Sequence, residues 1–196
     1  MKKLIVLISL YFFYSCSLPS YSLKNKYEPT SIDYSQGKWL LNSIDVNGLV
    51  RKKIEPQLLE EFSNALGERF TYYPNTLDIM IPRNIEMNPT KKQLKEIKQL
   101  TGFDYFINVK GDVLKDELGM ISGTKLDKTL RSNSSYMELE IYDLNNETIL
   151  YSQKVTGTSS RQEDNHDVYF SKSSLEILNK SFDKLLKDLQ SKTVRQ

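Results

Sequence analysis

The chain has 196 residues, of which 39% are hydrophobic and 27% charged, the balance of one globular domain with a short appendage. The formal net charge is +2, and without Lys2 and Lys3 at the amino terminus the chain carries 25 basic and 25 acidic residues. This neutrality argues against a global attraction to nucleic acid, and the single cysteine, Cys16, excludes an intrachain disulfide.

The amino terminus has the pattern of an export signal. Lys2 and Lys3 precede the run LIVLISLYFFY, residues 4–14, which is apolar or aromatic apart from one serine. This run is too short to span a bilayer as an ordinary helix, but it matches the apolar region of a signal peptide. The small residue Ser15 directly precedes Cys16.

Ser15 and Cys16 behind this run resemble a bacterial lipoprotein signal, with Phe13 standing where leucine is usual. The resemblance implies cleavage of a signal peptide at residues 1–15 and attachment of lipid to Cys16. It also implies a place in the cell envelope, in the outer membrane facing the periplasm. A plain secretory signal and a short membrane anchor are the alternatives, and all three export the protein.

Residues 16–36 show no sustained periodicity and are rich in Ser, Tyr, Lys and Pro. We therefore expect the lipidated cysteine to be followed by a flexible tether, with the globular domain at residues 37–196. The domain opens with an expected strand in KWLLNSIDV, residues 38–46, which ends at the turn signal Asn47-Gly48.

Three amphipathic helices are predicted from apolar residues at helical spacing. The first, in residues 55–70, has Pro56 in its first turn and Gly67 as its stop, and the second begins at a Thr90–Gln93 capping box. The third begins at Ser173, with Glu176 completing its capping box. The apolar faces are Ile54, Leu58, Phe62 and Leu66 for the first, Leu94, Ile97 and Leu100 for the second, and Leu175, Leu178, Phe182, Leu185, Leu186 and Leu189 for the third.

Alternation of apolar residues predicts strands in residues 76–81 and 103–114, and a hairpin with one wet face in residues 136–157. Residues 115–135 and 158–172 read as polar loops, where a docking surface would lie. The predicted fold is α+β (α/β-like), a single domain in which three helices pack on a mixed sheet of about five strands.

Two segments resemble a group of envelope α/β domains. In residues 94–114 the matching positions are Leu100, Gly102, Asp104, Tyr105 and Gly111, and in the hairpin they are Asp143, the Asn145-Asn146 turn and Gly157. The group includes the curli-secretion lipoprotein, the penicillin-binding-protein activator lipoprotein and the amino-terminal domain of TolB. The resemblance implies a non-enzymatic protein that binds another envelope protein.

Two other classes of function stay open. Gly37-Lys38-Trp39 is the start of lipocalin-like barrels that carry small ligands, although two internal helices leave little room for eight strands. A carboxylate-based hydrolase needs only two acids, and no catalytic motif supports it.

No cofactor is expected. Glu163, Asp164, His166 and Asp167 are candidate metal ligands, but closely spaced acids in a polar loop are usually solvated, so we predict no metal site. Asp112, Asp116 and Glu117 form a second, weaker acidic group.

Overall fold

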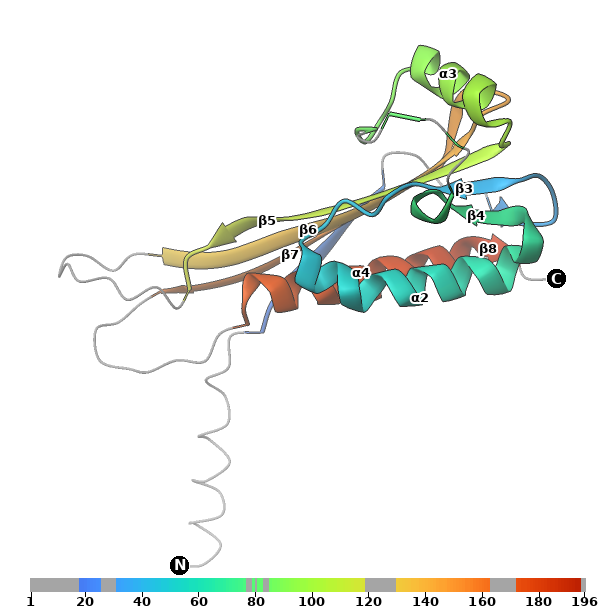
Figure 1. The fold of residues 1–196 in the computed structure, drawn as a ribbon. Helices are drawn as coiled ribbons and strands as arrows, with labels where there is room; N and C mark the ends of the chain where they lie inside the picture. The colour runs from blue at the N-terminus through green and yellow to red at the C-terminus, as the bar shows by residue number, and fades with distance from the viewer. Residues whose placement is uncertain are drawn as a thin grey trace, which may run out of the picture.

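The structure is a computed structural model that describes residues 18–25, 31–76, 79, 81–82, 85–118, 130–162 and 172–194. Three helices pack on a six-stranded mixed sheet in one α/β domain, which confirms the predicted fold class (Figure 1). A separate two-stranded parallel sheet joins β2 to β8. The elements are β1 (Ser20–Asn25), β2 (Ile32–Asp33), β3 (Trp39–Leu41), α2 (Gly48–Leu66), β4 (Phe70–Tyr72), α3 (Lys91–Thr101), β5 (Tyr105–Asp116), β6 (Leu130–Asp143), β7 (Thr148–Gln162), α4 (Ser174–Lys192) and β8 (Thr193–Val194), with 3₁₀ turns at Gly67–Arg69 and Tyr73–Asn75.

The strand order is β1-β7-β6-β5-β3-β4. Strands β3, β4 and β5 are parallel neighbours, while β5, β6, β7 and β1 pair antiparallel. The crossovers β3-α2-β4 and β4-α3-β5 run in opposite directions across the sheet. Because such crossovers share one hand, their helices are expected on opposite faces. In Figure 1, α2 and α4 lie side by side below the sheet, and α3 lies above it.

The sheet therefore has a hydrophobic core on each face. The larger core packs α2 and α4 against the sheet around Trp39, Phe62 and Phe182. The smaller one packs Leu94 and Ile97 of α3 against the opposite face. Strand β5 serves both cores, with Ile107 in the first and Phe106 in the second.

Helix starts and stops largely follow the sequence. Both predicted capping boxes are present, and Gly67 and Gly102 end α2 and α3 with positive φ angles. Helix α2 begins earlier than predicted because the Asn47 side chain accepts a hydrogen bond from the Leu49 amide. Asn47-Gly48 is thus the start of a helix rather than a turn, and Pro56 lies inside that helix.

The predicted tether at residues 16–36 differs from the structure. Strand β1 pairs along its whole length with β7, from Ser20 opposite Thr158 to Asn25 opposite Gln153, and β2 pairs with β8. Backbone hydrogen bonds thus place this largely polar segment on the sheet. The folded part begins well before Gly37.

Two further predictions are revised. Strands β6 and β7 extend the hairpin into the segments predicted as loops. The sheet is open, with β1 and β4 as its edges, so it is not a lipocalin barrel. Trp39, which suggested the barrel, is instead a core residue that stacks on Tyr105, with ring centroids 4.1 Å apart. The strand predicted at residues 76–81 falls largely on residues outside the described ranges.

Candidate functional site

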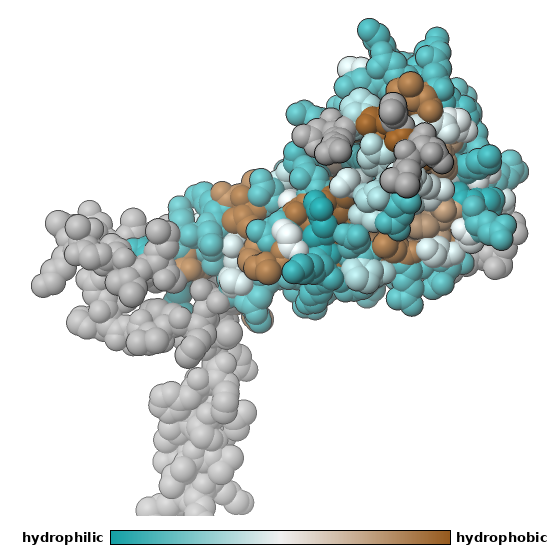
Figure 2. Space-filling view, in the orientation of Figure 1, coloured by the Kyte–Doolittle hydropathy of each residue, from teal (hydrophilic) through white to brown (hydrophobic). Residues whose placement is uncertain are grey.

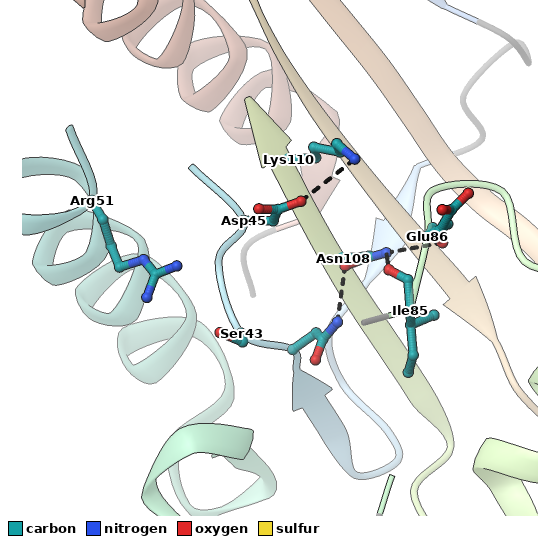
Figure 3. A pocket seen from close by; sticks show the side chains of 8 residues that line it. Ser43, Asp45, Arg51, Ile85, Glu86, Asn108 and Lys110 are labelled. Carbon is teal, nitrogen blue, oxygen red and sulfur yellow. Dashed lines mark hydrogen bonds and ion pairs between the residues drawn. The ribbon is translucent and has the colours of Figure 1, made fainter. Parts of the chain in front are cut away.

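A polar pocket of about 190 Å³ lies beyond the carboxyl end of β3 (Figure 3). Strand β3 leads through α2 to β4 on one side, while β5 on its other side leads away to β6. The carboxyl end of a strand at such a divergence is where open α/β sheets bind ligands. Four separate segments meet there, and the lining residues are Asn42, Ser43, Asp45, Arg51, Ile85, Glu86, Asn108 and Lys110.

Two buried asparagines hold the floor of this pocket. Asn108 Nδ2 donates to the Ile85 carbonyl at 2.9 Å, so its Oδ1 is left to accept from Asn42 Nδ2 at 3.1 Å. This order fixes the orientation of the Asn42 amide. Its Oδ1 then has no donor among the described residues, although the Asn42 side chain is buried. An unpaired buried acceptor is costly unless a water or a ligand donates to it.

Charges line the rest of the pocket. Lys110 Nζ lies 3.5 Å from Asp45 Oδ2, and this carboxylate raises the pKa of Lys110. Arg51 reaches in from α2, and its Nε has no hydrogen-bond partner within the described ranges. The pocket therefore offers one free acceptor and one free cationic donor, which suit a small polar ligand.

A second polar cluster is buried between β6, β7 and the segment before α3. Glu140, fully buried, accepts from the Asn88 amide at 2.7 Å, from Ser152 Oγ at 3.1 Å and from the Tyr142 hydroxyl. Asn88 has a φ of 60°, which aims its N–H at this carboxylate. Burial, followed by the bond to Glu140, raises the pKa of Tyr142 strongly.

The alternation of β6 predicts that Glu138 and Glu140 face water, and this prediction is wrong. The second core covers this face of the sheet at Phe106 and Tyr142, and both glutamates are buried. Glu138 instead pairs with Lys154 at 3.3 Å. Ser152 lies directly opposite Glu140 in the sheet. A hydroxyl paired across the strands with an acid is the sequence feature that could have indicated a buried, hydrogen-bonded carboxyl group here.

The residues of the envelope-domain resemblance meet at one end of the sheet. Asp104 accepts from Lys98 Nζ at 2.8 Å, from the Lys38 amide at 2.9 Å and from Asn145 Nδ2 at 3.2 Å. It thereby joins the end of α3, the start of β3 and the hairpin turn. Asp143 caps that turn by accepting from the Asn145 and Asn146 amides. These contacts give both acids structural roles.

Two glycines of the same resemblance mark close packing. A Cβ on Gly111 would lie 2.8 Å from Met137 Sδ, and one on Gly157 would collide with Ile177 and Tyr21. Leu100, which was predicted on the apolar face of α3, is 59% exposed. Among the residues that carry the envelope-domain resemblance, the glycines and aspartates therefore have structural roles.

The predicted site residues do not form one site. Cys16, Glu163, Asp164, His166 and Asp167 lie outside the described residues, so lipid attachment and the metal candidates stay predictions. The Asp112 side chain accepts from the neighbouring Val113 amide, and Glu117 accepts from the Ser132 amide across the ribbon. Asp116 is exposed near the end of β5.

Within the described ranges, none of the helices is long and apolar enough to cross a membrane. In those same residues no three His, Cys, Asp or Glu side chains gather closely enough to hold a metal ion.

Comparisons with known proteins give a likeness of fold. No family model and no curated protein matches the chain. The PelC dodecamer from Paraburkholderia phytofirmans is 11% identical, with 91% of this chain and 100% of that chain covered and a TM-score of 0.43. A neuraminyllactose-binding hemagglutinin homolog from Helicobacter pylori is 16% identical, with coverages of 84% and 86% and a TM-score of 0.40. Lipoprotein GNA1162 from Neisseria meningitidis is 12% identical, with coverages of 80% and 99% and a TM-score of 0.36.

These identities and TM-scores transfer no activity or partner to this chain. The resemblance to the curli-secretion lipoprotein group stays a prediction.

Proposed function

We propose that the protein is a lipid-anchored lipoprotein of the bacterial envelope that binds another envelope protein and is not an enzyme. The observation that carries the proposal is the lipoprotein-like signal ending at Cys16, followed after only three residues by β1. A folded domain that begins so close to a lipidation site is built to work at a membrane. Attachment to the outer membrane, facing the periplasm, is part of the proposal.

The arrangement of the acids supports binding over catalysis. The acids described above stabilise the fold, because each accepts hydrogen bonds or pairs with a lysine, and these contacts hold neighbouring segments together. They are Glu138, Glu140, Asp104 and Asp143. A hydrolase using two carboxylates needs both to face one cleft with access to water. The polar pocket presents Asp45 and Glu86, but Asp45 is engaged with Lys110.

Lipid labelling tests the anchor. The expressed full-length protein should incorporate a labelled fatty acid and fractionate with membranes, whereas Cys16→Ala should do neither. A soluble, unlabelled wild-type protein would contradict the anchor. Crosslinking in intact cells tests the partner. We expect a discrete crosslinked species for the wild-type protein that is absent for Cys16→Ala.

The pocket favours a second candidate function, the binding of a small polar ligand, because Asn42 Oδ1 and Arg51 Nε lack partners in the described part of the chain. Native mass spectrometry of protein purified from its own cells should then show a bound small molecule. Asn42→Leu, which removes the unpaired acceptor and makes this wall of the pocket apolar, should lose it. A wild-type protein free of added mass would contradict this candidate.

A further inference from the structure

Strand β1 ties the amino terminus rigidly to the body of the domain. All six of its residues pair with β7. Tyr21 packs against the larger core, with Gly157 beneath it and Lys184 Nζ 5.0 Å from its ring centroid. The position of Ser20 is therefore fixed relative to the sheet.

The chain between this fixed point and Cys16 is short. Ser17, Leu18 and Pro19 separate Cys16 from Ser20, so the two Cα atoms lie at most about 14 Å apart. A flexible tether through residue 36 would instead give an average reach of roughly 25 Å and free rotation of the domain. The short segment permits far less, and Pro19 stiffens it further.

The register of the sheet shows which end of the domain lies near Cys16. Ser20 pairs with Thr158, Thr158 with Ser134, and Ser134 with Lys115. Strand β7 runs on past this row to Gln162, about 13 Å at the usual rise per residue. The segment from Cys16 to Ser20 is thus about long enough to reach the tip of the ribbon formed by β5, β6 and β7.

The opposite end of the domain carries α3. From Ser134 to Asp143, strand β6 extends about 30 Å, and Asp143 lies at the hairpin turn near Asp104 and the end of α3. Figure 1 shows α3 at the far end of the sheet from the first residues of β1 and α4.

The end near Cys16 has side chains suited to a lipid surface. Leu18 is 83% exposed and Leu114 is 55% exposed, and both lie close to the Ser20–Lys115 row. The lysines there, Lys115 and Lys172, pair loosely with Glu117 and Glu176. Leucines with neighbouring long cationic side chains match the headgroup region, and the balanced charge requires no anionic lipid. Helix α3 carries a similar combination, with Leu100 59% exposed beside its lysines, so the short connection to Cys16 decides which end faces the bilayer.

From this geometry we infer that the anchored domain stands upright on the bilayer, with its Leu18–Leu114 end against the headgroups and α3 directed away. The inference rests on the proposed lipid anchor. It confines the partner-binding surface to the membrane-distal end, which holds α3, and to the flanks of the sheet.

Depth-dependent quenching tests this orientation. With Cys16 acylated, any introduced cysteine is the only free thiol, so a fluorophore can be placed uniquely. Leu114→Cys and Lys172→Cys mark the end near the anchor, and Lys92→Cys on α3, with an 87% exposed side chain, is the matched control. The full-length lipidated variants are reconstituted in phosphatidylcholine vesicles with and without brominated phosphatidylcholine.

About a twofold loss of fluorescence at Leu114→Cys and Lys172→Cys, with none at Lys92→Cys, is expected for headgroup contact at one end only. Equal quenching at all three positions would overturn the inference. So would no quenching in protein whose intact mass shows the lipid, and the anchor itself would then still stand. A protein whose intact mass lacks the lipid would contradict the proposed lipid anchor itself.

A spacer variant separates the short connection from any intrinsic membrane affinity. A flexible linker of about ten residues, made of Gly and Ser and inserted between Ser17 and Leu18, should reduce the quenching at Leu114→Cys toward that at Lys92→Cys, because the domain gains reach and rotation. Unchanged quenching would show that the length of the connection does not set the orientation.

Discussion

Glu140 is a fully buried carboxylate held by donors from three directions, Asn88, Tyr142 and Ser152. A carboxyl group in such a position is tolerated only when its hydrogen-bonding capacity is satisfied, and then it rigidifies the groups around it. Here it fixes the segment before α3 onto the sheet. The positive φ of Asn88 is the backbone cost of that contact.

Removing the Glu140 carboxylate should therefore cost more than removing one of its donors. We expect Glu140→Ala to lower the free energy of unfolding by about 3 kcal/mol, because the buried hydroxyls of Tyr142 and Ser152 both lose their acceptor. Ser152→Ala should cost about 1 kcal/mol, since one hydrogen bond is lost. Urea unfolding of both variants measures this, and a smaller loss for Glu140→Ala than for Ser152→Ala would contradict it.

Asp104 makes stability depend on pH. Its hydrogen bond from Lys98, followed by that from the Lys38 amide, lowers the pKa of this carboxyl below its usual 3.8. A lowered pKa adds stability that is present above pH 3.8 and is lost as pH falls through the lowered value. We expect Asp104→Asn to cost about 1–2 kcal/mol at pH 7 and to approach the wild type in acid.

The measurement is the free energy of unfolding from urea titrations at pH 7 and below pH 3. Asp183→Asn is the control, because Asp183 forms a half-exposed pair with Lys180 within one helix. A constant difference between Asp104→Asn and the wild type at both pH values would rule out the linkage.

At the scale of elements, β1 covers an edge that would otherwise be open. Strand β7 is long, and without β1 its outer hydrogen-bonding groups from Gln153 to Thr158 would face solvent. Exposed edges of this length pair with other chains. The strand thus protects the sheet as well as placing the amino terminus.

Deleting residues 1–25 should consequently cause self-association. A chain beginning at residue 18 is the matched control, since it also lacks the signal and Cys16 but keeps β1. Light scattering across a concentration series should show a monomer for the control and larger species for the deletion. A monomeric deletion variant with an unchanged melting temperature would show that β1 is dispensable.

The sequence predicts those elements whose signals are local. The capping boxes at Thr90 and Ser173, the glycine stops and the central part of the hairpin follow from side chains within a few residues of one another. Strand β1 escapes prediction because its polar–apolar alternation covers only Ser20–Lys24, and only Tyr21 packs inward while Leu23 is exposed. Its partner strand lies far along the chain, so the pairing is not visible in the local sequence.

The pocket escapes prediction for a related reason. Asn42, Arg51, Ile85 and Asn108 come together only when two crossovers and the sheet are in place. None of them forms a motif in the sequence. The alternation of β6 places Glu140 in solvent because periodicity indicates one covered face, whereas this sheet is covered on both.

At the scale of the whole molecule, the two cores differ greatly in size. Among the described residues, 23 buried apolar side chains form the core under α2 and α4, and seven form the core under α3. Helix α3 contributes only Leu94 and Ile97. Since burying one such side chain stabilises by about 1.5–3 kcal/mol, detaching α3 costs far less than unfolding the domain.

We therefore expect α3 to open locally while the rest stays folded. Hydrogen exchange followed by mass spectrometry should show faster exchange in residues 91–101 than in α4 or β6. Ile97→Ala should accelerate exchange in α3 alone, because it weakens only the smaller core, whereas Phe182→Ala should accelerate exchange throughout by lowering global stability. Equal protection of α3 and β6 would mean that both layers unfold together. Selective opening would make α3 the element best able to rearrange if the proposed partner binds there.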